Sequence, residues 1–101
     1  MMFHLIAECS TVSRELFPYS DNRQKAIVSD LRSNFYFKGQ FFPCRIEDAG
    51  AGIDYGDFGE ITLNVLINGD GLEYLLTPGA QFELKEGPHN LLAKCVVKYV
   101  L

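Results

Sequence analysis

The sequence predicts an all-β protein, folded as a sandwich or a barrel, and three observations support this. Several segments alternate apolar and polar residues with a period of two, the pattern of half-buried strands. Turn-forming residues separate these segments at short intervals, as in Asn68-Gly69-Asp70-Gly71 and Pro78-Gly79. No segment keeps apolar residues at helical spacing over about ten positions, so we expect no long helix.

The expected strands follow one another along the whole chain. They cover residues 3–12, 26–31, 33–48, 60–67, 72–77, 81–87 and 91–101, of which 26–31 is a short edge strand. Residues 13–25 are polar and predict a long loop with a short turn of helix. Residues 49–59 form a glycine-rich, acidic connection. No repeat or linker interrupts the chain, so we expect a single domain over residues 1–101.

The longest β-like run, residues 33–48, is rich in aromatic side chains around Lys38-Gly39. Strict alternation places Phe35, Phe37, Gly39, Phe41 and Pro43 on one face, and Tyr36, Lys38, Gln40, Phe42 and Cys44 on the other. We expect the first face to fill the core, Gly39 to mark a bulge or sharp bend, and Pro43 to end the pairing or mark an edge. The run also has a faint likeness to a strand on which RNA bases stack, and an exposed Phe42 would mark a binding surface.

Composition and charge narrow the function classes. The chain has 101 residues and a formal net charge of −4, with nine basic residues against thirteen acidic ones. Nucleic-acid binding is therefore not favoured, because phosphate contacts depend on basic side chains. The first residues lack the basic start of a signal peptide, and no apolar run approaches a membrane span of about 20 residues. We expect a cytoplasmic protein without a membrane-spanning segment.

No catalytic or metal-binding constellation occurs in the sequence. Cys9, Cys44 and Cys95 are widely spaced and odd in number, which favours reduced, buried thiols. A catalytic cysteine would need a histidine beside it, and nothing places His4 or His89 there. The histidines also lack metal-ligand spacing. We expect no enzyme activity, no cofactor and no metal.

Two segments resemble the C-terminal domain of bacterial elongation factor Tu. Residues 31–38, LRSNFYFK, are similar to a strand of that domain that reads Tyr-Arg-Pro-Gln-Phe-Tyr-Phe-Arg, and residues 81–101 are similar to its last hairpin. In that hairpin the matching positions are Phe82, Lys85, Glu86, Gly87, Val96, Val97, Lys98 and Leu101. Residues 3–15 fit the first strand of the family loosely. The matches occur in order and cover most of the chain.

The resemblance implies a closed antiparallel β-barrel of six strands without an active site. In the full factor this domain packs against a GTPase domain and touches aminoacyl-tRNA. The chain has no P-loop pattern, and Pro88 and His89 replace a Gly and an Arg of the family's hairpin turn. Asp57-Phe58-Gly59 stands where the family has Pro-Gly before its central strand. The resemblance therefore implies a free-standing relative of one barrel.

The acidic connection is the best candidate for a contact surface. The candidate partner-binding residues are Glu47, Asp48, Asp54, Tyr55, Asp57 and Phe58. Aromatics among carboxylates suit recognition of a basic protein, and calcium-loop spacing is not present. We expect a non-catalytic protein-binding module, such as an immunity protein (antitoxin) that blocks a basic toxin. The alternative is a translation-associated accessory that contacts RNA or a ribosomal factor.

Four basic residues lie in or beside the first long loop: Arg14, Arg23, Lys25 and Arg32. We expect their side chains to be solvated charges, and the alternative is a contact with RNA. The oligomeric state stays open.

Overall fold

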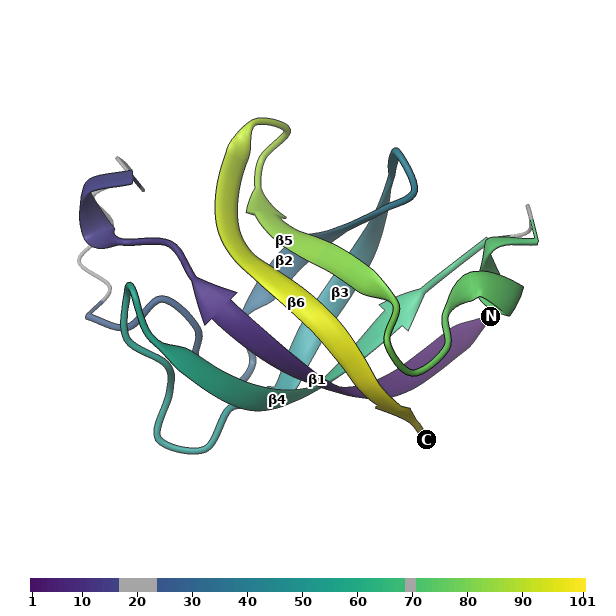
Figure 1. Cartoon of the computed structure of the whole chain (residues 1–101), viewed down its shortest axis with the longest axis horizontal. Helices are drawn as coiled ribbons and strands as arrows, with labels where there is room; N and C mark the ends of the chain where they lie inside the picture. Colours follow the sequence, from purple (N-terminus) through teal and green to yellow (C-terminus); the bar gives the residue numbers. More distant parts are fainter. Residues whose placement is uncertain (17–23, 69–70) are drawn as a thin grey trace.

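The computed structural model describes residues 1–16, 24–68 and 71–101, and these form a closed antiparallel β-barrel (Figure 1). Its strands are β1 (Met2–Thr11), β2 (Arg32–Phe37), β3 (Gln40–Asp48), β4 (Phe58–Leu66), β5 (Gln81–Glu86) and β6 (Asn90–Val100). They follow the order β1-β4-β3-β2-β5-β6 around the barrel. The described part contains no α-helix, only two short 3-10 helices, η1 (Arg14–Leu16) and η2 (Leu72–Leu75). The expected fold class of a closed six-stranded antiparallel barrel is thus confirmed.

The interior of the barrel follows the alternation of the strands. In β1 the buried side chains are Leu5, Ala7 and Cys9, and in β4 they are Ile61, Leu63 and Val65, as the period of two predicts. Phe35 of β2 stacks on Phe82 of β5 with ring centroids 4.2 Å apart. Each fully buried apolar side chain of this size contributes about 1.5–3 kcal/mol, so these rows supply most of the barrel's stability.

The run from 33 to 48 is not one strand but a two-residue hairpin. Lys38 and Gly39 have positive φ angles of 50° and 79° and connect Phe37 to Gln40, which is the geometry of a type I′ turn. The turn changes the phase of the alternation, so Phe42 is buried at 6% exposure and Phe41 is 45% exposed. The predicted faces were right for β2 and wrong for β3, and Gly39 is a turn residue rather than a bend within a strand.

Two segments expected to be strands have other structures, while an expected turn and a short helical turn are confirmed. Residues 72–77 are not a strand, because Leu72–Leu75 form η2. Residues 26–31 contribute only a single bridge, between Ile27 and Ile53, rather than a strand. The turn at Pro78-Gly79 is confirmed, since the Ala80 N–H donates to the Thr77 carbonyl at 2.9 Å. The predicted short turn of helix after the first strand is η1, while residues 69–70 of the predicted glycine turn lie outside the described residues.

The barrel is weakest in its pairing between β2 and β5. Only three residue pairs join these strands, from Asn34–Lys85 to Tyr36–Glu83, whereas β1 and β4 share nine. Beyond each end of this short ladder the two strands do not pair. An open groove lies at each end, one lined by Arg32 and Glu86 and the other by Lys38 and Gln81. These two grooves are concave features of the described surface.

Candidate functional site

The predicted acidic connection forms a loop, residues 49–57, at one end of the long axis of the barrel. The two chain termini and η2 lie toward the other end (Figure 1). At the base of the loop, Ile53 is buried and its backbone exchanges hydrogen bonds with Ile27 at 2.8 and 3.2 Å. A Cβ atom on Gly59 would lie 2.8 Å from the Ile53 side chain, so this glycine lets the loop fold back against β4.

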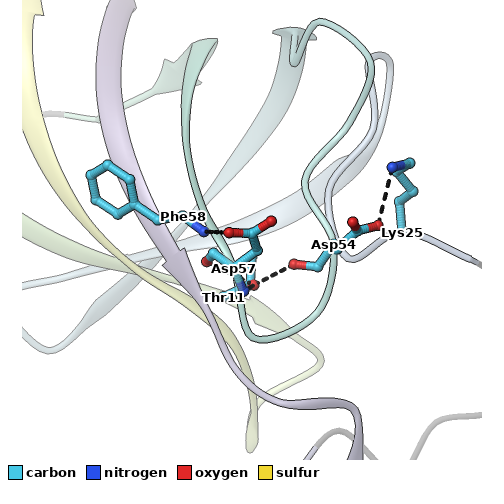
Figure 2. A network of polar contacts seen from close by, with 5 residues as sticks. All are labelled: Thr11, Lys25, Asp54, Asp57 and Phe58. Atoms are coloured by element: carbon cyan, nitrogen blue, oxygen red, sulfur yellow. Dashed lines mark hydrogen bonds and ion pairs between the residues drawn. The ribbon is translucent and has the colours of Figure 1, made fainter.

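Thr11 at the end of β1 holds the loop in place. Its hydroxyl donates to the Asp54 carbonyl at 2.6 Å and accepts the Asp57 N–H at 2.9 Å (Figure 2). The Thr11 backbone N–H also donates to the Asp57 carbonyl at 2.9 Å. Thr11 is the buried polar residue of the described core, at 6% exposure. A buried hydroxyl with donor and acceptor roles both filled fixes the path of a loop that has little other secondary structure.

The acidic residues near the loop fall into two pairs, and the first pair, Glu47 and Asp54, contacts side chains from other segments of the chain. Glu47 lies on β3, outside the loop, and its Oε1 accepts from the Asn64 amide at 3.2 Å and lies 2.7 Å from His4 Nδ1. Asp54 forms an ion pair with Lys25 at 3.0 Å. Glu47 and Asp54 are therefore both engaged by side chains of the same chain, Asp54 in an ion pair. Because the Asp54 pair is solvent-exposed, it adds only about 0–1 kcal/mol.

Asp48 and Asp57 act on the backbone beside them. Asp48 Oδ1 accepts the Gly50 N–H at 2.8 Å, and Asp57 Oδ1 accepts the Phe58 N–H at 2.8 Å. Within the described ranges neither carboxylate makes an ion pair, and both are exposed. These two side chains are the ones that a basic partner would meet with their charge unopposed.

The two aromatic residues of the predicted surface behave differently. Tyr55 is half-buried against the core, and the Arg14 guanidinium lies 4.6 Å from the centre of its ring. Phe58, at the start of β4, is 63% exposed, and its ring points away from Asp54 and Lys25 (Figure 2). Of the predicted pair, Phe58 is therefore the residue that offers a free aromatic surface.

Phe58 lines the groove at the Tyr36–Glu83 end of the β2–β5 ladder. We name this groove the Phe58 groove. The groove has a volume of about 550 Å³ and is lined by Glu8, Tyr36, Phe58, Glu83, Lys94 and Val96, among others. Val96 is 41% exposed, so two apolar side chains are open to solvent here. Acidic and basic groups surround this apolar strip, an arrangement typical of a small protein contact.

Three buried thiols lie inside the barrel. Cys9 and Cys95 are direct partners in the β1–β6 register, and all three cysteines are free. Burial raises the pKa of the Cys44 thiol to about 12 and raises the pKa of Cys95 as well, with a Cys9 hydrogen bond adding to the rise in Cys95. Since the thiolate is the reactive form, these thiols are poor nucleophiles. The expectation of reduced, buried cysteines is confirmed.

One buried residue and one surface residue of this region were not predicted from the sequence, and one candidate lies outside the described residues. Thr11 and Val96 were not predicted, although the alternation of β6 requires either Val96 or Val97 to point outward. Among residues 1–16, 24–68 and 71–101, no three His, Cys, Asp or Glu side chains lie together in a way that could hold a metal ion. No helix in these ranges is long and apolar enough to cross a membrane. Arg23 lies outside the described residues.

The sequence matches no known protein family. It also shows no significant similarity to a curated protein. The fold is thus established as a closed barrel of six antiparallel strands, and the finer relation to elongation factor Tu stays a prediction.

Proposed function

We propose that this protein is a small non-catalytic module that binds another protein through Phe58 and the adjoining groove. The exposure of Phe58 is the observation that carries the proposal. A large aromatic ring in water at the edge of a groove is the kind of side chain that dominates binding energy once it is buried in a partner. The anchoring of the loop by Thr11 supports it further, because a backbone that is already held just before Phe58 loses little entropy on binding.

The charge of the protein supports a basic partner. The net charge is −4, and Asp48 at the end of β3 and Asp57 in the loop that follows are both exposed. Opposite charges speed association, which suits a protein that must capture its partner quickly. An immunity protein that blocks a basic toxin is the concrete form of the proposal. Cytoplasmic location is part of the same proposal.

We also infer that the chain is a relative of the C-terminal barrel of elongation factor Tu. The ordered matches in residues 31–38 and 81–101 carry this inference, and the number and antiparallel arrangement of the strands agree with it. The shared architecture supports a relation between the two folds. The function of the chain depends on its own surface residues.

A second candidate function is a translation-associated accessory that contacts RNA or a ribosomal factor. One observation favours it: Tyr36 and Phe41 lie on the outer wall of the barrel with ring centroids 4.7 Å apart, and Phe41 is 45% exposed. Exposed aromatics beside a cation such as Lys38 can stack on bases. The net negative charge works against this candidate.

Affinity capture with matched variants tests the two candidates. The wild type, Phe58→Ala and Phe41→Ala would be used as baits in cell lysate of the source organism, with and without RNase. We expect a partner that survives RNase, is lost with Phe58→Ala and is retained with Phe41→Ala. With the purified partner, Phe58→Ala should raise the Kd at least about tenfold. A partner that RNase removes and that depends on Phe41 would contradict the proposal and favour the second candidate.

The contribution of the loop charges needs a separate variant. Asp54→Lys combined with Asp57→Lys reverses two charges and keeps the Phe58 ring, although it removes the carboxylate that accepts the Phe58 N–H. We expect slower association with a basic partner and a weaker effect at high salt, since exposed charges act mainly on the association rate. An unchanged association rate would exclude the acidic loop from the contact.

A further inference from the structure

The second groove, at the Asn34–Lys85 end of the β2–β5 ladder, has a different chemistry from the Phe58 groove. It has a volume of about 490 Å³, and its polar lining includes Arg32, Asn34, Arg45, Asn64, Lys85 and Glu86. We name it the arginine groove. Three cations line it in a protein whose formal net charge is −4. This concentration of positive charge is the first sign of an anionic ligand.

The strand register places the two arginines against each other. Arg32 of β2 is the direct cross-strand partner of Arg45 of β3, and both side chains are exposed on the outer wall. Like charges at such positions destabilise a sheet. Asp30 offsets one of them, because its Oδ1 accepts from Arg45 Nη2 at 2.7 Å. Arg32 makes no ion pair within the described parts of the chain.

Hydrogen-bond donors continue the row of arginines across the wall. Asn64 of β4 is the register partner of Arg45 and uses one amide N–H on Glu47 Oε1 at 3.2 Å, which leaves the other N–H for a ligand. Asn34 of β2 is the register partner of Lys85. Guanidinium and amide N–H groups together match the oxygens of a carboxylate, and an arginine can donate two parallel hydrogen bonds to one carboxylate. A like-charged pair kept on the surface at an energetic cost suggests a ligand that neutralises it.

The same wall is poorly suited to RNA. Lys85 Nζ lies 4.1 Å from the centre of the Tyr36 ring and covers one of its faces, so that face is not open to a stacked base. Acidic groups surround the cations as well, with Glu86 in the groove and Glu83 Oε1 3.7 Å from Lys85 Nζ. A polyanion would meet these carboxylates and the net negative charge, whereas a short segment with a few carboxylates fits between them.

We propose that the arginine groove binds a carboxylate-bearing segment of a partner protein, with Arg32 and Arg45 as the main contacts. This surface is separate from Phe58 and does not depend on the function proposed above. It would give the barrel two docking surfaces of unlike chemistry, one at each end of the β2–β5 ladder. The partner segment is defined by its acidic side chains.

A titration with a defined acidic peptide tests the proposal. An acetylated hexaglutamate peptide would be added to the 15N-labelled protein, and the side-chain amide signals of Asn34 and Asn64 would be followed by NMR. We expect these signals to shift with a sub-millimolar Kd. Arg32→Gln should raise that Kd at least tenfold, and the double variant with Arg45→Gln should abolish the shifts.

Lys94→Gln is the matched control, since it removes one exposed positive charge on β6, outside this groove. Its Kd for the peptide should stay within twofold of the wild type. Equal weakening by Lys94→Gln and Arg32→Gln would overturn the proposal in favour of unspecific charge attraction. Tighter binding of oligouridylate than of the peptide at the same residues would overturn it in favour of RNA. An absence of any shift at millimolar peptide would overturn it outright.

Discussion

The β2–β3 hairpin and the loop of residues 49–57 follow each other in the chain, yet different interactions order them. The hairpin is held by its ladder, in which Phe35 pairs with Phe42 and Tyr36 pairs with Phe41. The loop has only a single bridge, between Ile53 and Ile27, and its later part is bound by the Thr11 hydroxyl, which lies more than forty residues before Asp54. The hairpin is ordered by many repeated local contacts, and the loop by a few distant ones.

This difference decides where each region can carry function. In the hairpin, one inward and one outward side chain alternate, so the exposed set is fixed by the phase of the strand. In the loop, the exposure of a side chain depends on the backbone path, and the Thr11 hydroxyl fixes that path by binding the Asp54 carbonyl and the Asp57 N–H. Phe58 is the first residue of β4 and lies on its outward face, and the loop backbone just before it is bound through Asp57. The loop surface should therefore be sensitive to a change in the core, and the hairpin surface should not.

The largest effect is expected inside the hairpin. Phe42→Ala should lower the free energy of unfolding by about 3–5 kcal/mol, because it removes a buried ring and leaves a cavity. Phe41→Ala, the neighbouring and exposed position, should cost only about 0.5–1.5 kcal/mol from its contact with Tyr36. Urea unfolding followed by tyrosine fluorescence measures both values.

The two phenylalanines also test the phase of β3. If Phe41→Ala were the more costly change, uninterrupted alternation through Gly39 would be correct and the type I′ turn wrong. Phe42→Leu covers the case in which the alanine variant does not fold. It keeps most of the apolar volume and should still cost more than Phe41→Leu.

A smaller effect is expected at the anchor of the loop. Thr11→Val keeps the shape of the side chain but removes its hydroxyl, leaving the Asp54 carbonyl and the Asp57 N–H without this partner. We expect a loss of about 1–3 kcal/mol in unfolding free energy and faster hydrogen exchange at the Asp57 amide. Thr62→Val, on the half-buried outer side of β4, is the control and should stay within about 0.5 kcal/mol of the wild type. Equal values for the two variants would show that the loop does not depend on Thr11.

Much of the barrel could be predicted from the sequence because hydrophobic period is a local property. The inward rows of β1 and β4 were right residue by residue, and the strands at 81–87 and 91–101 differ from β5 and β6 by one residue at the boundaries. The error in β3 came from a turn that needs positive φ at Lys38, a residue with no turn preference. Leu72–Leu75 form a 3-10 helix, whose short apolar pattern resembles that of a strand.

The candidate site was harder to predict, because its geometry depends on contacts between distant segments. The sequence pointed to the acidic connection and to Phe58, but not to Thr11 or Val96. Nor could it show that Lys25 would pair with Asp54, or that Glu47 would face His4 across the wall. The pairing of Arg32 with Arg45 was equally hidden, since it depends on the register that the turn at Lys38-Gly39 sets.

A gradual effect is expected with pH at Cys44, the second inward residue of β3. Burial raises the pKa of this thiol to about 12, above the value near 8.5 of an exposed cysteine. The folded state therefore holds the proton longer than the unfolded state, so the contribution of Cys44 is complete below about pH 8.5. It is lost toward pH 12, by up to about 1.4 kcal/mol per pH unit.

Comparison with Cys44→Ala isolates this effect from the titration of lysines and tyrosines, which both proteins share. The difference in unfolding free energy between wild type and variant should be constant from pH 7 to about 8 and should shrink steadily from pH 8.5 to 10.5. The same series tests the comparison between hairpin and loop, because an inward Cys44 requires the phase that places Phe42 inside. A difference that stays constant up to pH 10.5 would mean that Cys44 faces solvent and that the arrangement of β3 described above is wrong.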